Sequence, residues 1–148
     1  MKTSLLAFII AAVAGSTMAL QGALNSALGK IVGLLEATLI VLVIGTITVL
    51  IILYPLNLGE GNLGNMSKAP WYTFLGGVLI VLITYGVVAS MPKIGVANAT
   101  TAIVAAQVAT AVFIDHFGLF GLEAVPFSYW KILGLVLMAA GTRLMLLQ

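Results

Sequence analysis

The sequence predicts an all-α, polytopic membrane protein that crosses the bilayer with five transmembrane helices. Hydrophobic residues make up 62% of the chain and charged residues only 7%, and the mean hydropathy is +1.24. Soluble domains carry roughly a quarter charged residues, so water cannot be the main solvent of this chain. Its 148 residues leave room for about five spans of about 20 apolar residues each.

Charged residues and prolines divide the chain into apolar runs. The predicted spans of this single membrane domain, residues 1–148, cover residues 4–28, 36–57, 70–91, 95–116 and 127–147. The four prolines close the second span, open the third, end the third and precede the fifth, in the order Pro55, Pro70, Pro92 and Pro126. Aromatic side chains that suit the membrane interface begin the third and fifth spans: Trp71, Tyr72, Tyr129 and Trp130.

The composition excludes several classes of function. The chain has no Cys, so disulfide frameworks, thiolate metal sites and thiol nucleophiles are absent. One His and few acids cannot supply a metal site with three or four protein ligands, and no catalytic triad pattern or phosphate-binding loop occurs. The basic residues form no cluster for nucleic acid. We therefore expect no enzyme, cofactor, metal or nucleic-acid partner, which leaves a small-molecule substrate and membrane lipid.

Polar side chains within the predicted spans are candidates for a substrate cavity. Gln21 and Asn25 follow Thr17 at intervals of four residues, so the three side chains share one side of a helix. An amide in hydrocarbon needs a partner, which is either a substrate in a polar cavity or another helix. Both interpretations stay open. The candidate cavity residues are Gln21, Asn25, Tyr85, Asn98 and Gln107.

Three ionisable residues are candidates for proton or cation coupling. Asp115 and His116 end the fourth predicted span, and ionisable groups in a membrane region commonly serve ion pathways. At a helix end, however, the pair can lie in the headgroup layer, where a charged His complements the helix dipole without any function. Glu36 begins the second span, where an acid in the first turn complements the dipole as well.

Small residues predict close packing between helices. Gly15, Ala19 and Ala23 recur every four residues on the first span, and Gly76 and Gly77 lie on the third. Transporters, channels and inert helix bundles all need such packing. The series therefore does not choose between functions.

The basic residues are balanced between the two sides of the membrane. With five spans, one side carries Lys2, Lys68 and Lys131, and the other carries Lys30, Lys93 and Arg143. Positive charge near span ends normally fixes orientation, so this balance leaves orientation undetermined. One interpretation is dual topology, in which two copies insert in opposite directions and pair as an antiparallel homodimer that reproduces an inverted repeat. The other is a single orientation, fixed by the amino terminus or by a paired partner subunit.

Several motifs, taken in chain order, resemble those of a known family. They are Gln21-Gly22-Ala23-Leu24-Asn25, Gly45-Thr46, Pro92-Lys93-Ile94-Gly95 and, most specifically, Gln107 followed by Ile114-Asp115-His116-Phe117-Gly118-Leu119-Phe120-Gly121. Together they resemble the half-size, five-span YdcZ-like exporters within the drug/metabolite transporter superfamily. The resemblance implies a multi-pass protein of the bacterial inner membrane. It also implies all-helical halves that assemble, as homodimers, paired homologous subunits or fusions, into a ten-helix unit with inverted repeats.

The first span departs from the pattern of the short families in that superfamily. Those families place a glutamate in the middle of the span for cation and proton exchange, whereas this span carries Thr17, Gln21 and Asn25 and no acid. The glutamate mechanism therefore cannot be transferred. Any coupling would have to come from Asp115 or Glu36, and otherwise the amides would mediate uncoupled movement.

These observations favour a secondary transporter subunit that exports a small molecule and works as an antiparallel dimer. We expect spans one, three and four of two copies to enclose a cavity lined by Asn25, Gln107 and Tyr85. The alternatives are a structural or accessory membrane subunit whose amides only hold helices together, and a passive channel.

Overall fold

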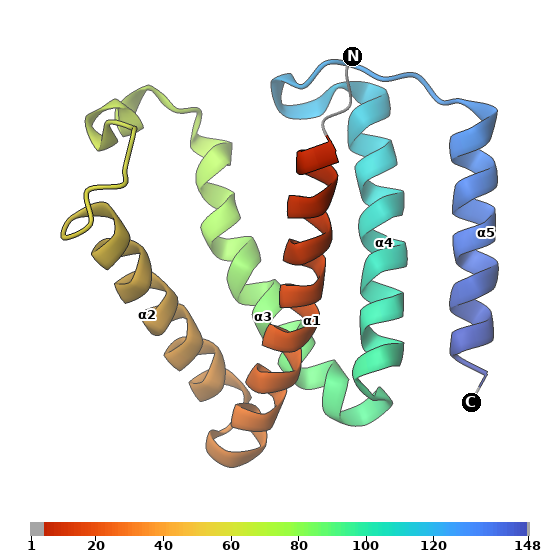
Figure 1. Cartoon of the computed structure of the whole chain (residues 1–148), viewed down its shortest axis with the longest axis horizontal. Coiled ribbons are helices and arrows are strands. Elements are labelled where there is room, and N and C mark those ends of the chain that lie inside the picture. The colour runs from red at the N-terminus through yellow and green to blue at the C-terminus, as the bar shows by residue number, and fades with distance from the viewer. Residues whose placement is uncertain (1–4, 148) are drawn as a thin grey trace. The chain divides into compact units, whose positions relative to one another are not determined.

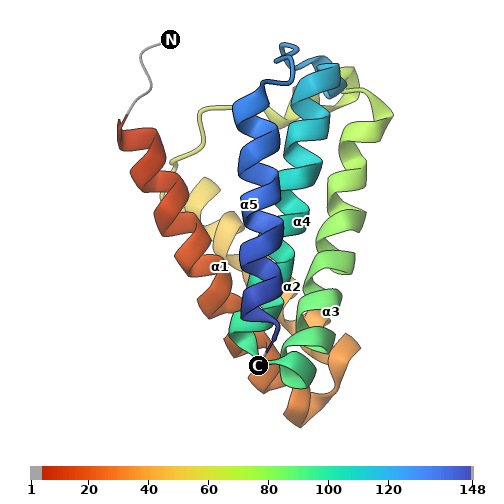
Figure 2. The ribbon, with the colours of Figure 1, turned by 90° about the vertical axis from the view of Figure 1, so that its right-hand side faces the viewer.

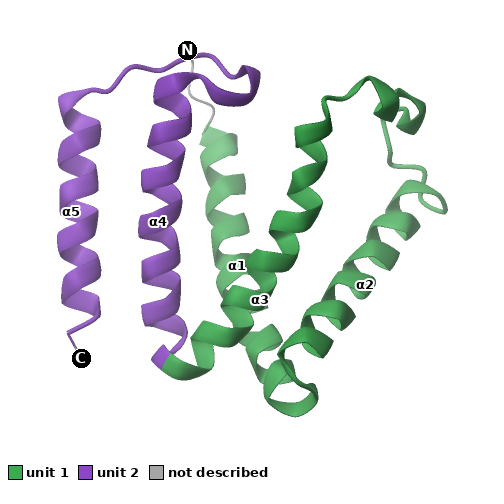
Figure 3. Ribbon diagram, turned by 180° about the vertical axis from the view of Figure 1, so that it is seen from behind, with its two compact units in different colours: residues 1–93 green, residues 94–148 purple. Residues whose placement is uncertain are grey.

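The computed structural model describes residues 5–147, and over that range it contains five α-helices, three short 3₁₀ helices and no strand (Figure 1). The helices fall into two compact units, residues 1–93 and 94–148 (Figure 3). The single membrane domain expected from the sequence stays a prediction.

The first unit begins with a helical hairpin whose turn is a single glycine. α1 (Leu5–Val32) and α2 (Leu34–Leu53) are joined by Gly33, whose φ of 103° and ψ of 159° belong to a region that only glycine adopts readily. The Gly33 N–H donates to the Gly29 carbonyl at 3.1 Å, and the Ala37 N–H donates to the Gly33 carbonyl at 3.0 Å. Because backbone hydrogen bonds continue on both sides of Gly33, α1 and α2 lie close at this end and diverge toward the other (Figure 1).

The rest of the first unit is a connection followed by a third long helix. The connection holds two 3₁₀ helices, η1 (Leu63–Lys68) and η2 (Trp71–Phe74), and α3 (Leu75–Ile94) follows. Asn62 begins η1, and its side-chain oxygen accepts the Gly64 N–H at 2.8 Å. Since this capping bond needs no distant partner, the local sequence is sufficient to form the turn.

The second unit is an antiparallel pair of helices, α4 (Val96–Phe117) and α5 (Tyr129–Met145), which lie side by side (Figure 2). α4 begins after Gly95, with φ of 85° and ψ of 158°, almost the same backbone conformation as Gly33. It ends at Gly118 in the left-handed region, and the short helix η3 (Leu119–Gly121) follows. The Ser128 side chain caps α5 by accepting the Lys131 N–H at 3.3 Å.

A small buried core forms where α1 and α3 meet in the first unit. A Cβ atom at Gly22 would lie 2.9 Å from Cγ1 of Val87, and one at Gly29 would overlap Cγ1 of Val88. Glycine therefore allows the two helices to approach at this crossing. The buried residues of the core are Gly22, Asn25, Ser26, Gly29, Ala37, Thr38, Thr84, Val88 and Met91.

The outward faces of the helices are apolar. Ile10 on α1, Ile47 on α2 and Leu82 on α3 each leave more than half of their surface exposed. Exposed apolar area on this scale is unfavourable in water. Four helices in the described part of the chain are long and apolar enough to cross a membrane, namely Leu5–Val32, Leu34–Leu53, Trp71–Ile94 and Val96–Phe117.

The first four predicted spans correspond to these four helices, with two differences in detail. Pro92 does not end the third span, because α3 continues through it to Ile94; this close to a helix end a proline removes only one helical hydrogen bond. α1 runs past residue 28 to Val32. α5 has 17 residues, at the lower end of the length that a span needs, so the fifth span stays a prediction.

The close packing predicted from small residues occurs at other glycines. No neighbouring atom lies within 4 Å of the Cβ position of Gly15, Gly76 or Gly77. The sequence spacing of small residues therefore located the correct helix, α1, but not the correct contact. The contact lies one and two heptads further along, at Gly22 and Gly29.

Candidate functional site

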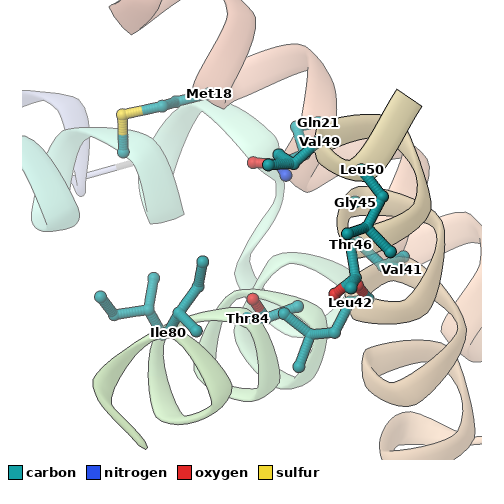
Figure 4. A pocket seen from close by; sticks show the side chains of 11 residues that line it. Met18, Gln21, Val41, Leu42, Gly45, Thr46, Val49, Leu50, Ile80 and Thr84 are labelled. Carbon is teal, nitrogen blue, oxygen red and sulfur yellow. The ribbon is translucent and has the colours of Figure 1, made fainter. Parts of the chain in front are cut away.

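A pocket of about 660 Å³ lies between α1, α2 and α3 of the first unit (Figure 4). Met18 and Gln21 line it from α1, and Ile80, Ile83 and Thr84 line it from α3. α2 supplies the remaining wall from positions that share one helical face: Val41, Leu42, Gly45, Thr46, Val49 and Leu50. The volume is in the range of small-molecule sites, which are mostly apolar with a few polar groups that orient the ligand.

Two glycines of the α1–α2 hairpin shape the pocket. Gly33 forms the turn that joins α1 and α2, and the helices diverge away from it, which leaves space between them at residues 41–50 of α2. Gly45 stands in the α2 wall, and no atom lies within 4 Å of the position its Cβ would take. The absence of a side chain at Gly45 therefore widens the pocket.

Two polar side chains of the pocket have no partner in the described part of the chain. The Thr84 residue exposes only 9% of its surface, whereas Gln21 is exposed, and neither side chain hydrogen-bonds to another described residue. Figure 4 shows the Gln21 carboxamide and the Thr84 hydroxyl pointing toward the same central space. Burial of the Thr84 hydroxyl without a hydrogen bond costs roughly 1–3 kcal/mol, and a bound ligand would remove that cost.

Thr46 offers a different kind of polar group. Its hydroxyl donates to the Leu42 carbonyl at 2.8 Å, as threonines in helices commonly do. Because the Thr46 hydroxyl proton is engaged in this hydrogen bond, the Thr46 oxygen can only accept a hydrogen bond from a ligand.

No charged side chain lines the pocket. In the described part of the first unit, the charged residues lie at helix ends or in the connection between helices: Lys30, Glu36, Glu60, Lys68 and Lys93. The pocket therefore presents hydrogen-bonding groups in surroundings that carry no formal charge.

The structure separates the cavity residues expected from the sequence. Gln21 lines the pocket. Asn25 is buried on α1 between Gly22 and Gly29, on the face that meets α3, and does not line the pocket. Tyr85 lies on α3, is 39% exposed and does not line the pocket.

The other two expected cavity residues lie in the second unit. Asn98 is half-buried near the start of α4, and Gln107 is exposed near its middle. Neither belongs to the pocket of the first unit. Among the lining residues that sequence reasoning missed are the two threonines, Thr46 and Thr84, and Gly45. The available signal was a threonine, in one case beside a glycine, in the middle of an apolar span.

Glu36 lies outside the pocket, in the first turn of α2. Its carboxylate folds back toward the turn, because a Cβ atom at Gly33 would overlap the Glu36 Oε2 atom. An acid three residues after the start of a helix complements the helix dipole there. This placement suits a structural role at the hairpin turn.

Asp115 and His116 are half-buried at the end of α4. The Asp115 carbonyl accepts the N–H groups of Gly118 at 3.3 Å and Val125 at 2.7 Å, which fastens the loop to the helix. The His116 ring lies 4.2 Å from the Phe127 ring and 4.8 Å from the Phe117 ring, centroid to centroid, and its Nδ1 is buried without a hydrogen bond. Among residues 5–147, no group of three or more His, Asp or Glu side chains could hold a metal ion.

Comparison with known proteins assigns the chain to a family. A family model described as "Putative inner membrane exporter, YdcZ" matches residues 6–144, which includes nearly all of the five α-helices. A search of curated proteins gave no match, and a search of solved structures gave none either.

Proposed function

Because the chain belongs to the YdcZ family of inner membrane exporters, we propose that it is one half of a secondary transporter that exports a small molecule across the inner membrane. An exporter is a transporter and not an enzyme, and several apolar helices suited to span a membrane agree with that location. In this proposal α5 forms the fifth span.

The observation that supports substrate binding is the pocket in the first unit. Gln21 of α1 and Thr84 of α3 both point into it and have no partner in the described chain. A subunit that only held other helices together would gain nothing from the buried Thr84 hydroxyl without a partner, because such a group lowers its stability.

Two copies in opposite orientations would complete the transporter. The three-to-three division of basic residues favours insertion in two directions, and an odd number of spans makes dual insertion useful for an antiparallel pair. An antiparallel pair would form an inverted repeat, and rocking of one half against the other would open the site to each side in turn.

Export can be tested by comparing variants that differ only in whether the pocket is filled. Gly45→Leu adds a side chain into the pocket, and Gly86→Leu adds the same side chain to α3 outside it; no atom lies within 4 Å of either Cβ position. Cells that express wild type or either variant are compared by mass spectrometry of the compounds in their medium. We expect compounds whose release is high with wild type and Gly86→Leu and low with Gly45→Leu.

The alternatives predict other results. A structural or accessory subunit predicts identical media for all three strains, which would refute export. Compounds found in the first step are then measured with purified protein in liposomes, where a transporter gives a flux that saturates with concentration. A flux that rises without limit would indicate a channel instead.

A further inference from the structure

The pocket also constrains the chemistry of what it binds. On the basis of the proposed function, we infer that the substrate is an uncharged amphipathic molecule with an apolar body and one hydrogen-bond donor group, such as an alcohol or an amide. The inference follows from three properties of the pocket: its charge, its hydrogen-bonding groups and its shape.

The first property is the absence of a counter-charge. The pocket has no acidic or basic side chain, and the acid on the same helix wall, Glu36, folds toward Gly33 and away from residues 41–50. An ion that leaves water for such a site loses its hydration without gaining a partner of opposite charge. Cations and anions are therefore disfavoured against neutral molecules of the same size.

The second property is the balance of donors and acceptors. The Thr46 hydroxyl already donates to Leu42, so Thr46 can only accept from a ligand. Gln21 and Thr84 have no partner in the described chain, and each can donate and accept. A ligand with only acceptors would leave Thr46 unused, whereas a hydroxyl or amide N–H can bond to any of the three.

The third property is the arrangement of polar and apolar walls. Gln21 and Thr84 point toward one space from α1 and α3, whereas the α2 wall is mainly aliphatic (Figure 4). Met18 adds a flexible thioether that adapts to different shapes. This arrangement places the polar group of the ligand between α1 and α3 and its apolar body along α2, and about 660 Å³ is room for a drug-sized molecule.

A series of photoreactive probes tests the inference. Four probes share one aliphatic body with a diazirine and end in a primary alcohol, a methyl ether, a carboxylate or a quaternary ammonium group. Wild-type protein in nanodiscs of phosphatidylcholine is labelled with each, and the labelled peptides are mapped by mass spectrometry. We expect saturable labelling of residues 41–50 by the alcohol, about tenfold weaker binding of the ether and about hundredfold weaker binding of both ions.

Three variants show whether the labelling comes from the pocket. Gly45→Leu is expected to abolish it and Gly86→Leu to leave it unchanged, since only Gly45 lines the pocket. Thr46→Val is expected to weaken the alcohol toward the level of the ether and to leave the ether unchanged, because only a ligand donor can bond to the Thr46 oxygen; a general loss of folding would weaken both probes.

Several outcomes overturn the inference. Equal or stronger labelling of residues 41–50 by either ion contradicts it, and so does labelling that Gly45→Leu does not change. Phospholipid that copurifies with wild type but not with Gly45→Leu, without saturable labelling by any probe, would identify an acyl chain as the occupant. Alcohol binding without export would refute the proposed export function but keep the inference about the chemistry of the pocket. Export of an ion that Gly45→Leu does not affect would keep the export function but refute the inference.

Discussion

Substitution of glycine by alanine along α1 tests the crossing between α1 and α3. Gly15, Gly22 and Gly29 are seven residues apart and so lie on nearly the same side of the helix. At Gly15 nothing lies near the Cβ position, whereas at Gly29 a Cβ would overlap Cγ1 of Val88, which is fully buried. The three substitutions are chemically identical, so their difference in stability measures the contact with α3.

The expected magnitudes come from two opposing effects. Replacing glycine by alanine inside a helix stabilises by up to about 1 kcal/mol, which is the whole effect expected for Gly15→Ala. Overpacking in a core costs about 1–3 kcal/mol, and Val88 cannot move aside easily because β-branched side chains are stiff. Gly29→Ala should therefore be destabilising, by up to about 2 kcal/mol net. Gly22→Ala should fall between them, since the flexible Met91 side chain is among its nearest neighbours.

The assay is the free energy of unfolding of purified protein in mixed micelles of dodecylmaltoside and sodium dodecyl sulfate, followed by circular dichroism. The control is a double-mutant cycle with Val88→Ala, which removes the clashing methyl groups. In that background Gly29→Ala should cost nothing, giving a coupling energy of about 1–3 kcal/mol. Equal stabilities for Gly15→Ala and Gly29→Ala, or a coupling energy near zero, would refute a close α1–α3 crossing at Gly29.

Four further predictions follow from the described residues. Ser128→Ala should lower the free energy of unfolding by only about 0.5 kcal/mol, because the Lys131 N–H loses the Ser128 hydroxyl at 3.3 Å but keeps the Ser128 carbonyl at 3.0 Å; an unchanged value would mean that α5 does not depend on this cap. Gly118→Ala should cost about 1–3 kcal/mol, since Gly118 is left-handed and its Cβ would lie 2.9 Å from the Leu122 carbonyl oxygen, and the same micelle assay checks it. Glu36→Gln should lower stability by about 0.3–1 kcal/mol and leave the pH profile of export unchanged, because Glu36 lies outside the pocket; a shifted profile would make Glu36 a coupling residue. Reporter fusions at the C-terminus should report from both sides of the membrane, and a signal from one side alone would contradict dual insertion.

The helices themselves could be predicted from sequence because their causes are local. Apolar runs of sufficient length, interrupted by charge and proline, locate the four membrane-spanning candidates to within a few residues. Pro55 and Pro126 fall outside helices as predicted. The prediction that Pro92 ends the third span was wrong, because a proline within a helix removes one helical hydrogen bond without necessarily ending the helix, and α3 continues to Ile94.

The sequence prediction does not include the two single-residue turns that begin α2 and α4. Gly33 and Gly95 each follow a basic residue at the end of an apolar run, and each adopts a positive φ that begins the next helix. A glycine in this position is a recognised helix boundary signal. The predicted first and third spans end before Lys30 and Lys93, although these lysines stand within the last turns of α1 and α3.

The sequence by itself determined that this chain is an all-helical membrane protein with amides on one side of its first helix. Only the tertiary structure decided what each amide faces. Gln21 and Asn25 are four residues apart and differ by about 40° around α1, yet Gln21 lines the pocket and Asn25 is buried beside the glycines that meet α3. The boundary between the two environments is set by where α3 crosses α1, through contacts of Val87, Val88 and Met91 with Gly22 and Gly29. These residues lie about 60 positions apart in the chain, so no local pattern in α1 could locate that boundary.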